Sequence, residues 1–121
     1  MMSIKIKRIY DEPEKFDGKR VLVDRLWPRG ISKEKADLDL WLKDIAPSPQ
    51  LRTWFSHEEE KFPEFTEEYM AELADDPLKQ KAVDDMVLMG KKGTVTLLYG
   101  AKSPTINHAA VLKQFLDKKS K

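Results

Sequence analysis

Two segments of this 121-residue chain carry apolar side chains on consecutive positions, where a half-exposed strand would alternate apolar and polar residues. They are VLVD at 21–24 and TVTLLYG at 94–100. Successive side chains of a strand point to opposite faces of the sheet, so this pattern predicts strands that are buried on both faces. Sheets of this kind are mostly parallel and covered by helices, and we therefore expect an α/β fold.

The other segments predict a single compact domain over residues 1–121. SIKIKRIY at 3–10 predicts a further strand with Ile4, Ile6 and Ile9 on one face, and 11–20 is a polar connector. Helices are predicted at 33–43 after Ser32, at 48–55, and at 106–118. Another helix is predicted after a capping box at Ser56–Glu59, with Phe62, Phe65, Tyr69 and Leu73 on its buried face. A fifth helix is predicted to start at Asp76-Pro77 and to stop at Gly90. The expected architecture is a small, mainly parallel three-stranded sheet flanked by helices.

The composition excludes several kinds of chemistry. The chain has no Cys, which rules out disulfides, thiolate metal sites and a cysteine nucleophile. No signal peptide and no run of about 18 apolar residues is present, so we expect a cytoplasmic protein without a membrane span. Two isolated His residues and the lack of a P-loop, dinucleotide or nucleophile-elbow motif predict no metal and no cofactor.

Charge is segregated along the chain although the net charge is only +1. Residues 36–85 hold 14 Asp/Glu against 5 Lys/Arg, residues 1–35 hold 10 Lys/Arg against 6 Asp/Glu, and residues 86–121 hold 7 against 1. Such asymmetry bears on binding partners more than on fold.

The stretch VLVDRLWPRGISKEK at 21–35 predicts a ligand site. A turn needs only its Pro and Gly, yet an acid, two arginines and a tryptophan also follow the strand within six positions. Ligands of open parallel sheets lie beyond the carboxyl ends of the strands. The predicted site comprises Asp24 and His108 as an acid/base pair, with Tyr10, Arg25, Arg29, Ser32, Lys33, Tyr99, Lys102 and Asn107 as ligand-binding residues.

These residue types favour a small anionic ligand. Guanidinium groups bind phosphate or carboxylate with two parallel hydrogen bonds, which Lys cannot do. The N-terminus of the last helix, at 105–108, offers free N–H donors to an anion and favours a neutral imidazole at His108.

Each candidate also has a structural interpretation. Asp24 can accept hydrogen bonds from loop N–H groups or pair with one of the two arginines, and Trp27 can pack under the loop. Asn107 can cap the helix locally while His108 bonds a neighbouring carbonyl. His57, beside three glutamates, is typical of a solvated helix start.

The motifs resemble the bacterial YeaO-like proteins of the family called domain of unknown function 488. The resemblance rests on VLVDRLWPRGISKE at 21–34, APS at 46–48, LRTWF at 51–55 and LLYGAKSPTINHAAVLKQFL at 97–116. It covers essentially the whole chain. Because the family has no established activity, the resemblance implies an architecture but no chemistry. Compared with longer members of the wider family, the helix between the first two strands is shortened to residues 11–20.

The resemblance also implies departures from those longer members, which carry Cys, Glu and a Cys-His-Arg triplet after the last strand. Tyr99 stands at the first Cys, Asn107 at the second and Ala109 at the Arg, whereas His108 matches the His. A thiol- or Glu-based mechanism therefore does not transfer to this chain.

Three functions remain open from the sequence. The first is a small enzyme, or an enzyme-like pocket, for a phosphorylated or nucleotide-like substrate. The second is a nucleic-acid-associated module that uses the basic ends of the chain, although no recognition helix or aromatic sheet motif appears. The third is a non-catalytic protein-interaction domain. No feature of the sequence sets an oligomeric state.

Overall fold

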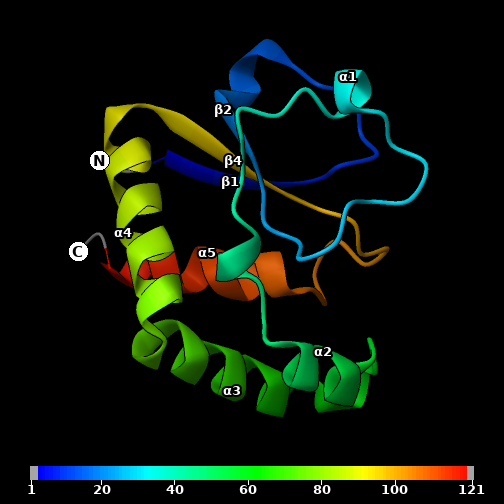
Figure 1. The fold of residues 1–121 in the computed structure, drawn as a ribbon, viewed down its shortest axis with the longest axis vertical. Helices are drawn as coiled ribbons and strands as arrows, with labels where there is room; N and C mark the ends of the chain where they lie inside the picture. Colours follow the sequence, from blue (N-terminus) through cyan, green and yellow to red (C-terminus); the bar gives the residue numbers. More distant parts are fainter. Residues whose placement is uncertain (1–2, 120–121) are drawn as a thin grey trace.

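The computed structural model describes residues 3–119 and shows a four-stranded parallel sheet at the centre of the molecule (Figure 1). The strands are β1 (Ser3–Arg8), β2 (Lys19–Leu22), β3 (Leu40–Trp41) and β4 (Thr94–Tyr99), in the spatial order β1-β4-β2-β3. Ile4 lies opposite Val95, and Val21 lies opposite Leu97. The predicted parallel α/β fold is confirmed, but the predicted count of three strands is wrong.

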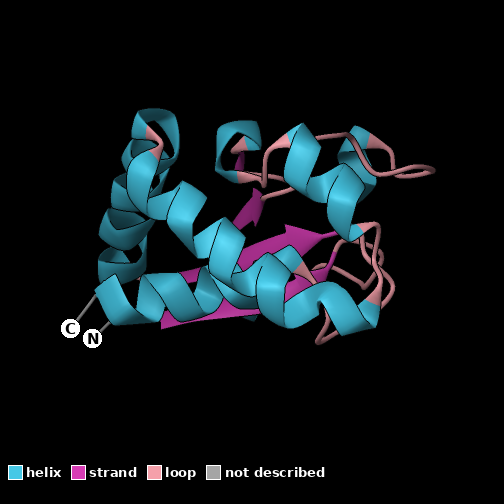
Figure 2. Ribbon diagram, turned by 90° about the horizontal axis from the view of Figure 1, so that it is seen from below, coloured by secondary structure: helices cyan, strands magenta, loops and turns pink. Residues whose placement is uncertain are grey.

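Five α-helices and three short 3-10 turns connect the strands within residues 3–119. The helices are α1 (Lys33–Ala36), α2 (Pro49–Phe55), α3 (Phe62–Asp75), α4 (Pro77–Lys92) and α5 (His108–Lys119), and the turns are η1 (Lys15–Asp17), η2 (Lys43–Ile45) and η3 (Glu59–Lys61). The longer helices, which Figure 2 shows with the sheet, pack against one of its faces. None of the helices in this part of the chain combines the length and apolarity needed to span a membrane.

The two faces of the sheet have different covers. Val21, Val23 and Leu97 point to the larger core, which α2, α3, α4 and α5 complete. Leu22 and Leu98 point to a smaller core on the opposite face, which the segment from residue 25 to α1 covers. The consecutive apolar residues of β2 and β4 are therefore buried on both faces, as the sequence predicted.

The first strand differs from its prediction in one respect. Ile4 and Ile6 pack against the larger core, whereas Ile9 belongs to the smaller one. Ile9 is separated from the other two by an odd number of positions, so it points to the opposite face of the sheet.

The predicted helix over 33–43 is wrong. Helix α1 ends before Asp37, which adopts a left-handed backbone with φ 48°. Asp39 then accepts a hydrogen bond from the Arg20 backbone N–H at 2.8 Å, and Leu40–Trp41 pair with β2 as the fourth strand. Aspartate favours turns over helix interiors because its carboxylate competes for backbone N–H groups, and this competition ends the helix early.

Two predicted helix boundaries are also wrong. The S-x-x-E motif at Ser56–Glu59 does not cap a helix, because residues 56 and 57 end α2 in left-handed conformations with φ 46° and 58°. Helix α3 begins later, at Phe62, without a side-chain cap. Gly90 does not stop α4, which continues to Lys92 with Gly93 as its C-cap.

A buried ionic cluster stands where the connector between β1 and β2 meets the sheet. The Arg20 guanidinium donates to Asp17 at 2.6 Å, and the Lys7 ammonium donates to the same carboxylate at 3.1 Å. Arg20 also donates to the carbonyls of Ala36 at 2.7 Å and Asp37 at 3.0 Å. The cluster thereby joins β1, β2 and the end of α1.

The cluster shifts the pKa of its members toward the charged forms. Burial alone would raise the pKa of Asp17, but hydrogen bonds from the Glu14 backbone, Lys7 and Arg20 outweigh it and leave that pKa below its ordinary value. Burial likewise opposes the charge of Lys7, yet Glu14 and Asp17 raise its pKa above the ordinary value. The ionised forms therefore stabilise the folded chain.

Candidate functional site

The ends of β2 and β4 meet at one edge of the sheet, and Asp24 joins them. Asp24 follows β2, and its Oδ2 accepts a hydrogen bond at 2.9 Å from the backbone N–H of Gly100, which follows β4. A Cβ atom at position 100 would lie 3.0 Å from this Oδ2, so glycine allows the close approach. The carboxylate is thereby fixed at the carboxyl edge of the sheet.

Asn107 determines where α5 begins. Its Oδ1 accepts a hydrogen bond from the Ala110 N–H at 2.8 Å, and its Nδ2 donates to the Ser103 carbonyl at 2.9 Å. Only 1% of Asn107 is exposed, so both bonds are shielded from water. This cap, one of the structural interpretations above, holds His108 in the first turn of the helix.

His108 points from α5 toward the end of β2. Its Nε2 lies 3.0 Å from the Val23 carbonyl and 3.2 Å from Asp24 Oδ1. A carbonyl can only accept, so Nε2 carries the hydrogen of this bond. The contact with Asp24 is within ion-pair distance but does not meet hydrogen-bond geometry, and Oδ1 is buried without a hydrogen-bond partner among residues 3–119.

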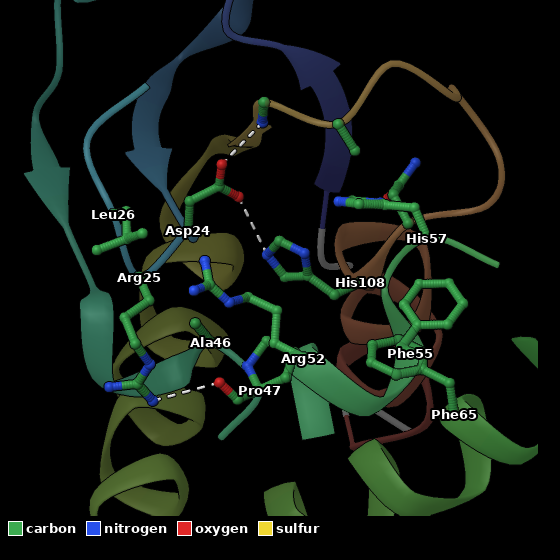
Figure 3. Close-up of a pocket in the computed structure, with 13 residues that line it drawn as sticks. Asp24, Arg25, Leu26, Ala46, Pro47, Arg52, Phe55, His57, Phe65 and His108 are labelled. Atoms are coloured by element: carbon green, nitrogen blue, oxygen red, sulfur yellow. Dashed lines mark hydrogen bonds and ion pairs between the residues drawn. The ribbon is translucent and has the colours of Figure 1, made fainter. Parts of the chain in front are cut away.

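A hollow of about 200 Å³ opens beside this pair (Figure 3). Its lining comes from the ends of β2 and β4, from the segment before α2, from α2 and α3, and from the start of α5. The lining residues are Asp24, Arg25, Leu26, Ala46, Pro47, Arg52, Phe55, His57, Phe65, Gly100, Ala101, Asn107 and His108.

Two arginines with little internal pairing line the hollow from different elements (Figure 3). Arg25 donates through Nη2 to the Pro47 carbonyl at 3.3 Å, while its Nε is buried without a partner within residues 3–119. Arg52, from α2, makes no side-chain hydrogen bond or ion pair within that part of the chain. Asp24 is the one carboxylate among the described lining residues, and no ion pair joins it to either arginine.

The apolar side of the hollow is aromatic. Phe55 and Phe65 are buried and stack with ring centroids 4.2 Å apart. Behind them, Tyr69 is fully buried, donates to the Ile45 carbonyl at 2.6 Å and meets the His108 ring edge-on at 6.2 Å. Burial raises the pKa of Tyr69 well above its ordinary value, so this hydroxyl stays protonated as a donor.

Tryptophans brace the backbone that carries Asp24. Trp41 donates from Nε1 to the Asp24 carbonyl at 2.7 Å, and Trp27 packs edge-on against Trp41 at 5.3 Å. Trp27 in turn donates to the Ile31 carbonyl at 2.6 Å. Trp27 therefore packs under the loop, which confirms its structural interpretation.

The structure brings together four of the predicted site residues and separates the others. Asp24, Arg25, Asn107 and His108 line the hollow, and Lys102 lines a second hollow next to it. The others lie elsewhere: Arg29 and Lys33 are exposed, Tyr10 donates to the Arg29 carbonyl, Ser32 caps α1, and Tyr99 is buried in the larger core.

Several lining residues were not predicted. Arg52, His57, Phe55 and Phe65 come from α2, α3 and the turn between them. The helical spacing of Phe55 and Phe65 indicated core residues. An arginine within a helix, such as Arg52, gives no sign in the sequence of the cavity that it faces. His57 was assigned to a solvated helix start, and it is exposed at the rim of the hollow.

The described residues do not suit a metal ion. Within residues 3–119, no group of three or more His, Asp or Glu side chains is close enough to hold one. The hollow also holds the two guanidinium groups of Arg25 and Arg52, whose positive charges repel a cation.

A family model described as "Inactive DUF488-N3 subclade" matches residues 3–121. The chain belongs to this DUF488 subclade. It is 49% identical over 115 residues to the uncharacterized protein YeaO of Escherichia coli, covering 95% of this chain and 97% of that protein. The uncharacterized proteins Mb3100c of Mycobacterium bovis and Rv3073c of Mycobacterium tuberculosis are each 38% identical over 114 residues, covering 94% of this chain and 93% of theirs. No solved structure matches this DUF488 chain.

Proposed function

We propose that this DUF488 protein is a non-catalytic binding domain for a small molecule bearing a phosphate or carboxylate, held in the hollow at the carboxyl edge of the sheet. One observation carries the proposal: Arg25 and Arg52 line one hollow, and neither is ion-paired to a carboxylate of the described chain. Two cations in one hollow repel each other, and an anion that bridges them removes this repulsion.

The buried, unpartnered Nε of Arg25 supports the same proposal. A buried donor without a partner costs roughly 1–3 kcal/mol, and native proteins contain few of them. An oxygen of the anion would accept from this Nε, while Phe55 and Phe65 form the apolar wall of the hollow that holds the anionic group.

Two features favour binding without chemistry. Asp24 and His108 are both engaged in bonds that join β2, β4 and α5, to the Gly100 N–H at 2.9 Å and the Val23 carbonyl at 3.0 Å respectively. The matching family model is described as inactive, and the thiol- or Glu-based groups of the longer members are replaced here.

Ligand-induced stabilisation tests the proposal. Phosphate, methyl phosphate, sulfate and acetate would each be titrated while the melting temperature is followed, with isothermal calorimetry on any anion that shifts it. A ligand at about 100 times its Kd adds roughly 2.7 kcal/mol, which raises Tm by about 10 °C. Arg25→Gln and Arg52→Gln should each weaken binding about tenfold or more, whereas Arg29→Gln should not, because Arg29 is exposed like Arg52 but does not line the hollow. Absence of a shift with every anion would disprove the proposal.

A second candidate is a small acid/base enzyme for such a ligand, with Asp24 and His108 as its catalytic pair. The contact of 3.2 Å between Asp24 Oδ1 and His108 Nε2 favours it, because a carboxylate beside one ring nitrogen orients the other as a base. Incubation of a bound phosphate ester with the wild type and with His108→Gln would separate the two candidates. Turnover by the wild type that His108→Gln abolishes would establish the enzyme.

A further inference from the structure

A second hollow lies beside the first and shares part of its lining. It measures about 460 Å³, and His57, Gly100 and Ala101 line both. Its other lining residues are Glu59, Lys102, Ser103 and Ile106. In Figure 3, His57 lies on the opposite side of His108 from Arg25, at the end of the first hollow where the shared lining begins.

The volumes of the two hollows limit the size of the ligand that each can hold. Small-molecule sites usually measure about 300–1,000 Å³, so the first hollow, at about 200 Å³, is too small for more than a head group. The two hollows together fall within the usual range. A ligand larger than a bare anion has room to extend past His57 into the second hollow.

The lining of the second hollow differs in charge from that of the first. The first has two arginines against one carboxylate, whereas the second has one cation, Lys102, against one carboxylate, Glu59. Ile106 and Ala101 supply its apolar surface. This hollow carries no excess charge to attract a second anionic group, and its apolar surface suits carbon.

We infer that the ligand is an amphiphilic anion, with one phosphate or carboxylate head at Arg25 and Arg52 and an uncharged carbon body that passes His57 and lies on Ala101 and Ile106. This inference rests on the proposed function, because the first hollow must hold the anionic head. It adds the class of the ligand, its orientation and a second set of binding residues.

Two homologous series test the inference by calorimetry: methyl, butyl and octyl phosphate, and acetate, pentanoate and nonanoate, below their micelle concentrations. A buried methylene contributes about 0.8 kcal/mol, so the longest member should bind at least roughly tenfold more tightly than the shortest in one series. Arg25→Gln should weaken all members of that series alike. Ile106→Ala should reduce the gain with length at least about threefold and leave the shortest member unchanged.

Controls separate this inference from the proposed function. Lys102→Gln should change affinities less than about twofold, and a larger loss on this variant would place the head in the second hollow and overturn the orientation. Leu88→Ala removes an apolar side chain on α4 that lines neither hollow and should change nothing. Ile106 packs partly against the larger core, so the milder Ile106→Val, with circular dichroism of each variant, keeps the test valid if the alanine variant unfolds.

Equal affinity along both series would overturn the extended site while leaving the proposed function intact, and no binding by any member would overturn both.

Discussion

The ionic cluster around Asp17 and Arg20 and the carboxyl edge of the sheet differ in how completely their charged side chains are bonded. In the cluster around Asp17 and Arg20, each buried side-chain nitrogen and oxygen has a hydrogen-bond partner within residues 3–119. At the carboxyl edge of the sheet, Asp24 Oδ1 and Arg25 Nε have none. A fully bonded cluster stabilises the fold, whereas a partly bonded one leaves atoms available to a ligand.

Arg20, within β2, and Arg25, just after the end of β2, differ in how completely their guanidinium groups are hydrogen-bonded. The Arg20 guanidinium meets a carboxylate at 2.6 Å and two backbone carbonyls, and the residue is 3% exposed. Arg25 has one carbonyl partner at 3.3 Å. The same substitution at the two positions should therefore affect different properties of the protein.

The largest expected effect is on stability at Arg20. Arg20→Gln should lower the free energy of unfolding by about 3 kcal/mol, because it removes one buried partner of the Asp17 carboxylate and the donor of the Ala36 and Asp37 carbonyls. Urea unfolding followed by circular dichroism measures this, with Arg29→Gln as an exposed control within about 0.5 kcal/mol of the wild type. A loss below about 1 kcal/mol would show that the bonded cluster does not stabilise the fold.

At Arg25, the expected effect is on binding. Arg25→Gln should weaken anion binding by about 1.5–3 kcal/mol, the value of a charge-assisted hydrogen bond, while the free energy of unfolding changes by less than about 0.5 kcal/mol. Calorimetry and urea unfolding on the same preparation measure both quantities. If stability fell as far as in Arg20→Gln, the contrast between the two regions would be lost.

Gly100→Ala should have a smaller effect, on the order of 1 kcal/mol in stability. The new methyl group would crowd Asp24 Oδ2 at 3.0 Å and displace the carboxylate from the Gly100 N–H. Ligand affinity should fall as well, since this carboxylate lines the hollow. Gly93→Ala is a matched control, because a Cβ there meets nothing within 4 Å.

The smallest effect is the pH dependence of the bonded cluster. The pKa of Asp17 lies below its ordinary value of 3.8, so its contribution to stability is complete above that pH and is lost as the pH falls below it. The wild type should lose stability more steeply than Asp17→Asn between about pH 4 and pH 2. Urea midpoints across this interval measure the difference, and parallel curves would contradict the assignment.

The parallel fold could be predicted because its signal is local. The consecutive apolar residues of β2 and β4 require two covered faces, and Asn107 at the start of α5 is a strong cap. β3 could not be predicted, because a two-residue strand has no periodicity and depends on β2 to pair with it. Two aspartates, Asp37 and Asp39, indicate an early end of helix α1, but the bond of Asp39 to the Arg20 backbone is visible only in three dimensions.

The candidate site, like the fold, could be predicted only where its residues follow from the local sequence and the strand topology. Asp24, Arg25 and His108 lie at the end of a strand and the start of a helix, where topology alone brings them to one edge. Arg52 lies within α2, and only tertiary packing decides which way such a side chain faces. Arg29 was predicted as a site residue because it lies in the same turn as Arg25. In the structure, the Arg29 side chain is exposed, just before Gly30, which has φ 79°.

The indole of Trp41 bonds the Asp24 carbonyl at 2.7 Å, and Trp27 packs against Trp41, so two of the three tryptophans in the chain are linked to the backbone of Asp24, one directly and one through the other. Indole fluorescence depends on the polarity and hydrogen bonding of its surroundings. Any event that moves the Asp24 carbonyl therefore alters the emission of the native chain, which gives the protein an optical readout of occupancy without an attached dye.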